Sequence, residues 1–171
     1  MLSKLEILKE IKNKNIQITP FNFNNFGPVS VDLTLSDTFR VFTTSKKAYK
    51  VSENTDVDLF SKKIKLTKGK TLKIKPKELV LGSTLEKITL SKNIVGRLTG
   101  RSRFARLGLA VHVSSDLVQP GVDNVQVLEI VNNSPYVLEL IPNEKICQIT
   151  FEKITNPSAV YSGKFAKQTQ P

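Results

Sequence analysis

The 171-residue sequence contains one cysteine, one histidine and no tryptophan. A single cysteine, Cys147, excludes an internal disulfide framework and suits a reducing cytosol. One histidine and one cysteine cannot supply the His/Cys/Cys or Cys₃ ligand set of a catalytic zinc site, and the Pro-Cys-x-x-Cys motif that often accompanies such a site is absent. Zinc-dependent chemistry of this kind is therefore excluded.

Long apolar runs are also missing from the sequence. No stretch approaches the ~18 residues that suggest a membrane span. The first residues, Met1–Glu6, include an acidic residue and no uninterrupted apolar stretch, unlike a signal peptide. The length fits one domain, and 39% hydrophobic residues are enough for a packed core. We expect a single cytoplasmic domain over 1–171, with no membrane partner.

The net charge of +11 comes largely from one segment. Between Lys46 and Lys77, eleven lysines stand against three acidic residues, which supplies +8 of the total. These lysines alternate with apolar residues, as in Lys63–Leu66, and alternation is typical of the outer face of a β-strand. Lysine also protects edge strands. Because no aromatic residues interleave with the lysines from Lys62 to Lys77 to stack bases, we expect a solvated strand face and no nucleic-acid partner.

The N-terminal region predicts one short helix over residues 3–13. Ser3 and Glu6 form a capping box, and Leu5, Leu8 and Ile11 lie near one face. The following stretch, 20–28, is rich in turn residues and contains phenylalanines that we expect to be buried anchors. We divide the chain into this helical region (1–15), a β core (16–155) and a polar tail (156–171), which in isolation would be disordered.

From Val29 onward the hydrophobic period changes to two, and Gly, Pro and Asn punctuate many short segments. This pattern predicts an all-β sandwich or barrel. The predicted strands are 29–35, 39–42, 63–66, 71–74, 78–81, 86–90, 94–98, 109–113, 125–131, 137–141 and 145–152.

The segment Gly100–Gly108 has the composition of a polyphosphate site. It carries Arg101, Arg103 and Arg106 within six residues, and guanidinium groups and backbone N–H groups both bind phosphate oxygens. It lacks the Walker A spacing. A basic surface turn is the alternative that this segment leaves open.

Glu129 is the second candidate. Alternation along Val125–Val131 puts its carboxylate on an apolar strand face. Burial there would raise the pKa of the carboxyl group, which is one way to tune a general base. The alternative is a glutamate paired with a buried arginine.

Several segments, in order along nearly the whole chain, resemble dCTP deaminases. They are Ile18–Phe21, Ser30–Leu33, Phe39–Phe42, Leu81–Glu86, Gly100–Ser102, Ala105–Leu109, Val111–Val113, Pro120–Gly121, Leu128–Glu129, Gln148–Phe151, Tyr161, Gly163–Phe165 and Gln168. The resemblance implies a jelly-roll β-barrel like that of trimeric dUTPases, a homotrimer with active sites between subunits, and Mg²⁺ carried by the nucleotide triphosphate.

The resemblance also implies roles for individual residues. Glu129 matches the catalytic base, while Ser102 and Arg106 match residues that position the water and stabilise charge. The residues expected to contact substrate are Arg101, Ser102, Arg103, Phe104, Ala105, Arg106, Gln119, Val127, Leu128, Gln148, Tyr161, Lys164 and Gln168. The last three lie on a C-terminal arm that would close over the nucleotide.

The expected reaction is deamination of dCTP to dUTP and ammonia without zinc. The family's second serine is replaced by Arg103, and its Asp before Pro-Gly is replaced by Gln119. Bifunctional relatives carry Gly and an aromatic where this chain has Asp116-Leu117. These departures favour deamination alone over the alternatives, a bifunctional enzyme that forms dUMP or a dUTPase. Feedback inhibition by dTTP through His112 and Val113 is a further expectation.

Overall fold

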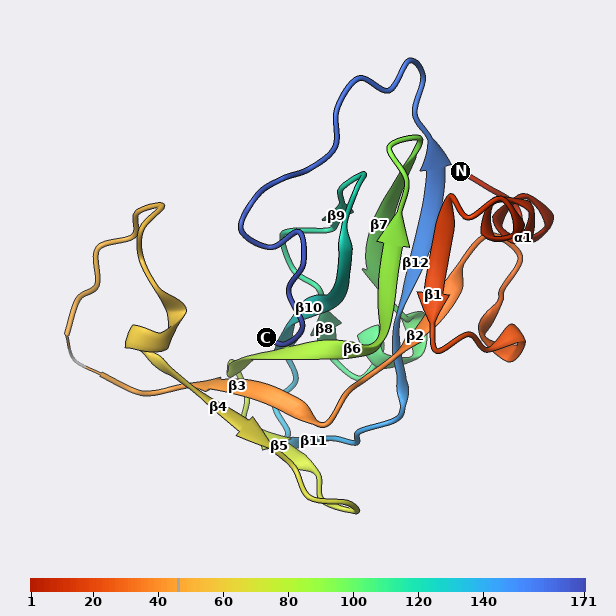
Figure 1. Ribbon diagram of the computed structural model, residues 1–171. Helices are drawn as coiled ribbons and strands as arrows, with labels where there is room; N and C mark the ends of the chain where they lie inside the picture. The colour runs from red at the N-terminus through yellow and green to blue at the C-terminus, as the bar shows by residue number, and fades with distance from the viewer. Residues whose placement is uncertain (46) are drawn as a thin grey trace.

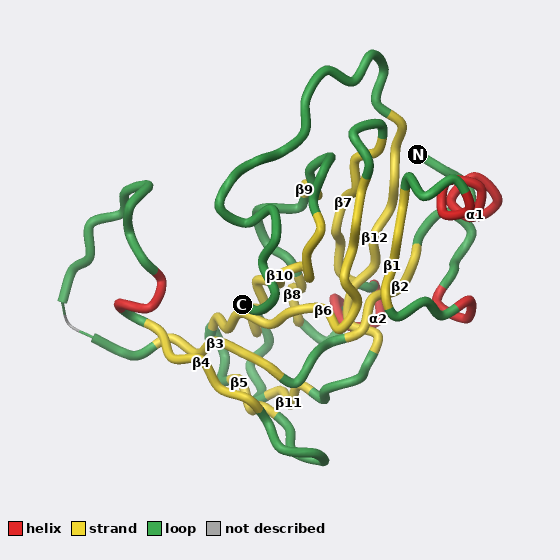
Figure 2. Tube along the Cα trace, in the orientation of Figure 1, coloured by secondary structure: helices red, strands yellow, loops and turns green. Residues whose placement is uncertain are grey.

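The structure is a computed structural model that describes residues 1–45 and 47–171, mostly as β-strands (Figures 1 and 2). The strands are β1 (Ile16–Thr19), β2 (Val31–Thr34), β3 (Thr38–Phe42), β4 (Ser61–Lys65), β5 (Leu72–Ile74), β6 (Leu79–Leu90), β7 (Ile94–Gly100), β8 (Leu109–Val111), β9 (Leu117–Val118), β10 (Asp123–Asn132), β11 (Leu138–Leu140) and β12 (Lys145–Lys153). The helical segments are α1 (Lys4–Lys12), η1 (Phe23–Asn25), η2 (Val57–Leu59) and α2 (Ser102–Ala105). The predicted all-β fold with a short N-terminal helix is confirmed.

The described strands form three antiparallel sheets. One sheet has the order β2-β12-β7-β9, the largest has the order β4-β3-β6-β10-β8 with β1 added along β6, and β11 pairs with β5. The long strand β6 is shared, since Lys87–Leu90 pair with β1 while Val80 and Leu81 pair with β3. The sequence predicts two separate strands here; the structure has one, because β10 pairs along both halves of β6.

The core is aliphatic, as the scarcity of aromatic residues requires. Its largest fully buried side chains include Phe39 and Phe151, surrounded by Ile, Leu and Val from both larger sheets. No helix within the described ranges is long and apolar enough to cross a membrane.

The predicted capping box of α1 is confirmed, with Ser3 N donating to Glu6 Oε2 at 2.8 Å. The predicted apolar face is wrong for Leu5, which is 80% exposed, whereas Ile11 packs partly against the core; Glu10 takes a buried position of the helix. Glu10 can lie there because Lys153 pairs with its carboxylate at 2.8 Å and Asn15 donates to it at 2.6 Å. These partners lower the pKa of Glu10 despite its desolvation.

The lysine-rich segment includes the edge strand β4, where Lys62, Lys63 and Lys65 are exposed. The predicted solvated strand face is confirmed for these residues, and Lys46 lies outside the described residues. Two short strands, β1 and β9, were not predicted; each is too short to show a clear alternation.

The tail over residues 156–171 contains no helix or strand, but it packs against β10 (Figure 1). Asp123 N donates to Ala166 O at 2.9 Å, Val125 N donates to Gln168 O at 3.2 Å, and the Asn124 side chain donates to Phe165 O at 2.6 Å. These bonds give order to a segment that would be disordered in isolation.

Candidate functional site

Arg101 is fixed at the end of β7, immediately before α2. Its guanidinium pairs with Asp32 of β2 at 3.1 Å and donates to the Lys145 carbonyl at 2.7 Å. The preceding Gly100 lies so close to β8 that a Cβ would be 3.2 Å from the Val111 carbonyl oxygen. The side chain of Arg101 therefore has one well-defined orientation beside β2 and β12.

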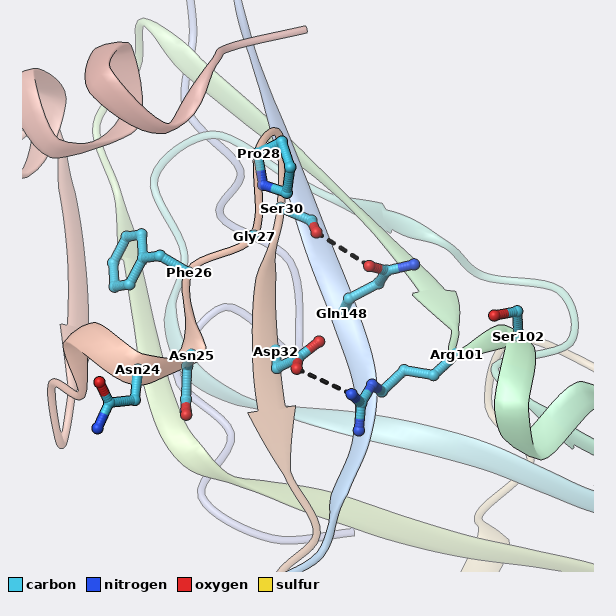
Figure 3. Close-up of a pocket in the computed structure, with 10 residues that line it drawn as sticks. All are labelled: Asn24, Asn25, Phe26, Gly27, Pro28, Ser30, Asp32, Arg101, Ser102 and Gln148. Carbon is cyan, nitrogen blue, oxygen red and sulfur yellow. Dashed lines mark hydrogen bonds and ion pairs between the residues drawn. The ribbon is translucent and has the colours of Figure 1, made fainter.

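Gln148 of β12 lies beside this ion pair. Its Cα is opposite Asp32 on one side and Thr99 on the other. Ser30 Oγ donates to Gln148 Oε1 at 2.9 Å (Figure 3). Gln148 Nε2 contacts the Gly100 carbonyl at 3.5 Å. The amide group of Gln148 is thereby oriented from two sides.

These residues line a polar pocket of about 340 Å³, which we name the Arg101 pocket. Its lining residues are Asn24, Asn25, Phe26, Gly27, Pro28, Ser30, Asp32, Arg101, Ser102 and Gln148 (Figure 3). Guanidinium, amide and hydroxyl groups are the donors that bind phosphate oxygens in proteins. Of the predicted substrate contacts, the structure brings together Arg101, Ser102 and Gln148 in this pocket.

The rest of the arginine-rich segment does not line the Arg101 pocket. Arg103, Ala105 and Arg106 are exposed, and Phe104 packs partly against the core. Gly108 ends the segment with a φ of +83°, where a Cβ would lie 2.8 Å from Ser134 Cβ. Within one chain, Arg103 and Arg106 therefore lie on a basic surface turn, which is the alternative that the sequence left open.

The N-terminal wall of the pocket was missed by sequence reasoning. Phe21 and Phe23 were expected to be buried anchors, but they are 50% and 54% exposed. Phe26 does pack partly against the core, and the wall is formed by Asn24–Pro28. The alternation of Ser30-Val31-Asp32 was the available signal, because it turns Ser30 and Asp32 away from the core toward the same side.

Glu129 lies in a second location, which we name the Glu129 cradle: Glu129 on β10 with His112, Val113 and Ser114 after β8. His112 has a φ of +69°, so the chain turns sharply there. Three consecutive backbone N–H groups then point at Glu129: His112 N donates to its carbonyl at 2.8 Å, while Val113 N and Ser114 N donate to Oε2 at 3.0 and 2.6 Å. Such successive N–H groups form an anion-binding nest.

The predicted environment of Glu129 is wrong in two respects. Its strand face is only half-buried, because β10 turns Asn124, Gln126, Leu128 and Ile130 inward instead. Desolvation raises its pKa, but hydrogen bonds from the Ser114 side chain and backbone, together with the charge of His112, outweigh that effect and lower the pKa below its ordinary 4.5. Glu129 forms no ion pair with an arginine among the residues that the structure describes, so the alternative of a buried pair has no support.

The remaining predicted contacts lie outside the Arg101 pocket. Val127 and Leu128 pair with Ser83 and Gly82 of β6. Gln119 is half-buried in the turn before β10.

On the tail, Tyr161 N donates to the Pro120 carbonyl at 2.8 Å, and Gln168 Nε2 donates to the Val125 carbonyl at 3.2 Å. Lys164 is exposed, with Nζ 5.7 Å from the centre of the Phe165 ring. Within the described part of the chain, no hydrogen bond or ion pair joins Glu129 to the arginine-rich segment.

Cys147 is fully buried behind the pocket, and burial, reinforced by the charges of Glu86 and Asp32, raises the pKa of its thiol far above the usual range. A buried thiol that stays protonated is unreactive, so Cys147 serves as core packing. His112 contacts the Ser115 carbonyl through Nε2. That contact helps to fix the turn of the Glu129 cradle.

The dCTP deaminase-like family model matches residues 1–154 of the chain. A "dCTP deaminase, dUMP-forming" of Methanosphaera stadtmanae is 35% identical over 179 residues, which cover 100% of this chain and 91% of that relative. A dCTP deaminase of Rhodospirillum rubrum is 32% identical over 165 residues, which cover 92% of this chain and 85% of that relative.

Solved structures resemble the fold at low sequence identity. A 2'-deoxycytidine 5'-triphosphate deaminase from Agrobacterium tumefaciens aligns with a TM-score of 0.67 at 16% identity; the match covers 90% of this chain and 48% of that longer chain. A mutant dUTPase from a phage of Staphylococcus aureus, phage phi11, aligns with a TM-score of 0.52 at 13% identity and covers 88% of this chain and 97% of that one. The predicted dUTPase-like β fold is confirmed.

Proposed function

Because the chain belongs to the dCTP deaminase-like family, we propose that it is an enzyme that hydrolyses the exocyclic amine of dCTP and releases ammonia. The observation that carries this proposal is the Glu129 cradle, in which a half-buried carboxylate is kept ionised and fixed in orientation by donors from one turn. An ionised, oriented carboxylate can accept a proton at neutral pH.

In the proposed reaction, Glu129 takes a proton from a water molecule as the water oxygen bonds to C4 of cytosine. The tetrahedral intermediate then loses its amino group, and the proton held by Glu129 is returned to the departing nitrogen. The C4–N4 bond breaks and ammonia leaves. The C4 hydroxyl of the intermediate becomes the carbonyl as its proton passes to N3 of the ring, which took the electron pair of the C4–N3 double bond when water added, and uracil results. Ser102 and Arg106, both exposed on or next to α2, are the residues that we propose to position the water and stabilise charge at the base.

The Arg101 pocket is the proposed triphosphate site. Arg101 supplies a fixed guanidinium, Gln148 supplies an oriented amide, and Ser102 supplies a hydroxyl at its rim. Mg²⁺ would enter with the nucleotide, since this ion is held mainly by substrate phosphates and water. The polar oxygens of the pocket fit a hydrated ion of this kind, and no dedicated protein cage is needed.

A second product is favoured by the names of the relatives. The Methanosphaera stadtmanae protein and several others are named as dUMP-forming, which supports deamination followed by loss of diphosphate. Gln119 stands against it, because an amide is a poor base at the position where the resemblance expects a carboxylate. We therefore keep dUTP as the first product and dUMP as the alternative.

One experiment separates these outcomes. The purified protein is incubated with dCTP and Mg²⁺, and nucleotides and ammonia are quantified. Ammonia with dUTP supports deamination alone, and dUMP with diphosphate supports the bifunctional alternative. If neither dCTP nor dUTP is consumed, the proposed function is wrong. The variant Gln119→Asp should increase the dUMP fraction if the missing carboxylate limits diphosphate release.

We further propose a homotrimer whose sites combine residues of two or three chains, because within the described residues of one chain no hydrogen bond, ion pair or shared pocket links Glu129 to the Arg101 pocket. Cytoplasmic location and inhibition by dTTP through His112 and Val113 stay predictions. An initial rate of dCTP consumption that is unchanged by added dTTP would contradict the latter.

A further inference from the structure

The side chain of Ser114 makes a contact with Glu129 that the backbone of the cradle cannot replace. Its Oγ lies 2.8 Å from Glu129 Oε1 and 3.0 Å from Oε2, within donating distance of both carboxylate oxygens. Ser114 is the only residue of the described chain that approaches this carboxylate with both its backbone and its side chain.

The two kinds of donor have different consequences for a base. A backbone N–H group can only donate, so Val113 N and Ser114 N stabilise the ionised carboxylate and oppose its protonation. A serine hydroxyl can donate or accept and rotates to suit. It can therefore donate to ionised Glu129 and accept a hydrogen bond from the protonated form.

The two carboxylate oxygens are also unequal. Both backbone N–H groups donate to Oε2, whereas among the described residues Oε1 is contacted only by the Ser114 hydroxyl. Oε1 therefore retains a free lone pair, and it is the oxygen that can receive the proton of water. Oε2 anchors the group.

We propose that Ser114 is the positioning residue of Glu129: its hydroxyl orients Oε1 toward the reacting water and changes from donor to acceptor when Glu129 takes the proton. This inference rests on the proposed deamination and adds a residue to which no role has been assigned. Ser114 itself transfers no proton to substrate in this scheme.

Among the residues that the structure describes, one charged neighbour bears on the pKa of Glu129. His112 is the ionisable neighbour that acts on the pKa of Glu129. In the same loop, Asp116 is paired with Arg97 at 3.0 Å, which limits its influence. A change in the pKa of Glu129 on altering Ser114 would therefore report the lost hydroxyl.

The test compares Ser114→Ala and Ser114→Val, which lack the hydroxyl, with Ser114→Thr, which keeps it. Ser114 is exposed, so these changes leave the core intact. The control is Ser115→Ala, since the Ser115 side chain makes no hydrogen bond within the described residues. Steady-state rates with dCTP are measured across pH, and the pKa of Glu129 is followed by ¹³C NMR with the signal assigned from Glu129→Gln.

The Ala and Val variants should lose about tenfold or more in kcat with little change in KM, as expected when a hydrogen bond to a charged group is lost. Their Glu129 pKa should rise, and Ser114→Thr and Ser115→Ala should resemble the wild type in both properties. Equal kcat and pKa in wild type and Ser114→Ala would overturn the inference, as would failure of threonine to restore them.

The NMR titration separates this inference from the proposed function. If the wild type does not consume dCTP, the proposed function fails, yet a raised Glu129 pKa in Ser114→Ala that threonine reverses would still support the positioning role. If the wild type deaminates dCTP but Ser114→Ala leaves the pKa of Glu129 unchanged, the positioning role of Ser114 is rejected and the proposed deamination is retained.

Discussion

The Glu129 cradle and the Arg101 pocket are built in opposite ways. The cradle joins residues about fifteen positions apart, through backbone N–H groups of one turn. The pocket joins β2, β7 and β12 through side chains, and its Ser30–Gln148 bond spans 118 positions. A single side-chain substitution can therefore remove the contacts that form the pocket, whereas it leaves the backbone N–H donors of the cradle in place. The difference agrees with the proposed roles, in which the cradle holds the catalytic base and the pocket binds the triphosphate.

Replacing Glu129 with Gln should have the largest effect on turnover. The amide keeps the shape and an acceptor oxygen for the cradle but cannot take a proton from water, so kcat should fall about 10³-fold. The dissociation constant for dCTP, measured by calorimetry, should change by less than about threefold because the triphosphate contacts remain. If Glu129→Gln retains turnover, Glu129 is not the catalytic base. If the variant no longer binds dCTP, the separate roles of the cradle and the pocket are contradicted.

Replacing Arg101 with Ala should act on binding instead. The change removes a phosphate donor and leaves Asp32 without its partner, so KM for dCTP should rise about 30-fold or more. Arg101→Lys should recover only part of the affinity, since an ammonium group cannot contact Asp32 and the Lys145 carbonyl in the same fork geometry.

Arg103→Ala is the matched control for this prediction, because Arg103 is exposed on α2 and does not line the pocket. Its KM should change much less than that of Arg101→Ala. Equal effects of the two substitutions would mean that net positive charge, and not the fixed geometry of Arg101, determines binding.

Ser30→Ala should produce a smaller change in the same direction. Without the Ser30 hydroxyl, the Gln148 amide loses one of the two contacts that orient it, and KM should rise about fivefold, the value of one ordinary hydrogen bond. Steady-state kinetics should show kcat unchanged. A fall in kcat alone would place Ser30 in the chemistry of the site instead.

The smallest expected change concerns pH. Since the pKa of Glu129 is lowered from 4.5, its carboxylate stays ionised at neutral pH and loses its charge only as the pH falls through that lowered value. Between about pH 5.5 and 8, kcat/KM should therefore show no fall caused by Glu129. The contradicting result is a fall of kcat/KM at acidic pH with a midpoint near 6. If Ser114→Thr keeps that midpoint and Ser114→Ala moves it to higher pH, the pKa of Glu129 is raised instead of lowered.

Sequence patterns predicted the fold well where periodicity was strong. The alternation along Val29–Leu35 and Val125–Val131 marked β2 and β10, and the Ser3–Glu6 capping box marked the start of α1. The predicted strand boundaries were wrong where pairing with a neighbouring strand determines them. In β6 the two predicted strands form one, because both halves pair with β10.

Some residues of the candidate site can be picked out from the sequence, but their arrangement cannot. The arginine-rich segment and Glu129 are visible as motifs, yet alternation alone assigned Glu129 to the wrong face, because the Asn and Gln residues of β10 are buried through hydrogen bonds that a hydropathy pattern does not reveal. The pocket's N-terminal wall depends on pairing of β2 with β12, which is a long-range contact.

Mixed trimers test most directly whether the cradle and the pocket of different chains form one site. Glu129→Gln and Arg101→Ala chains are co-expressed with different tags and mixed trimers are isolated. Ammonia release is compared with that of each parent at a dCTP concentration far below the KM of Arg101→Ala, where both parents turn over slowly. If the two regions meet between chains, about one third of the sites in isolated mixed trimers contain both native residues, and activity returns to a corresponding fraction of wild type. Mixed trimers as inactive as their parents would contradict a shared site and require Glu129 and Arg101 to act within one chain.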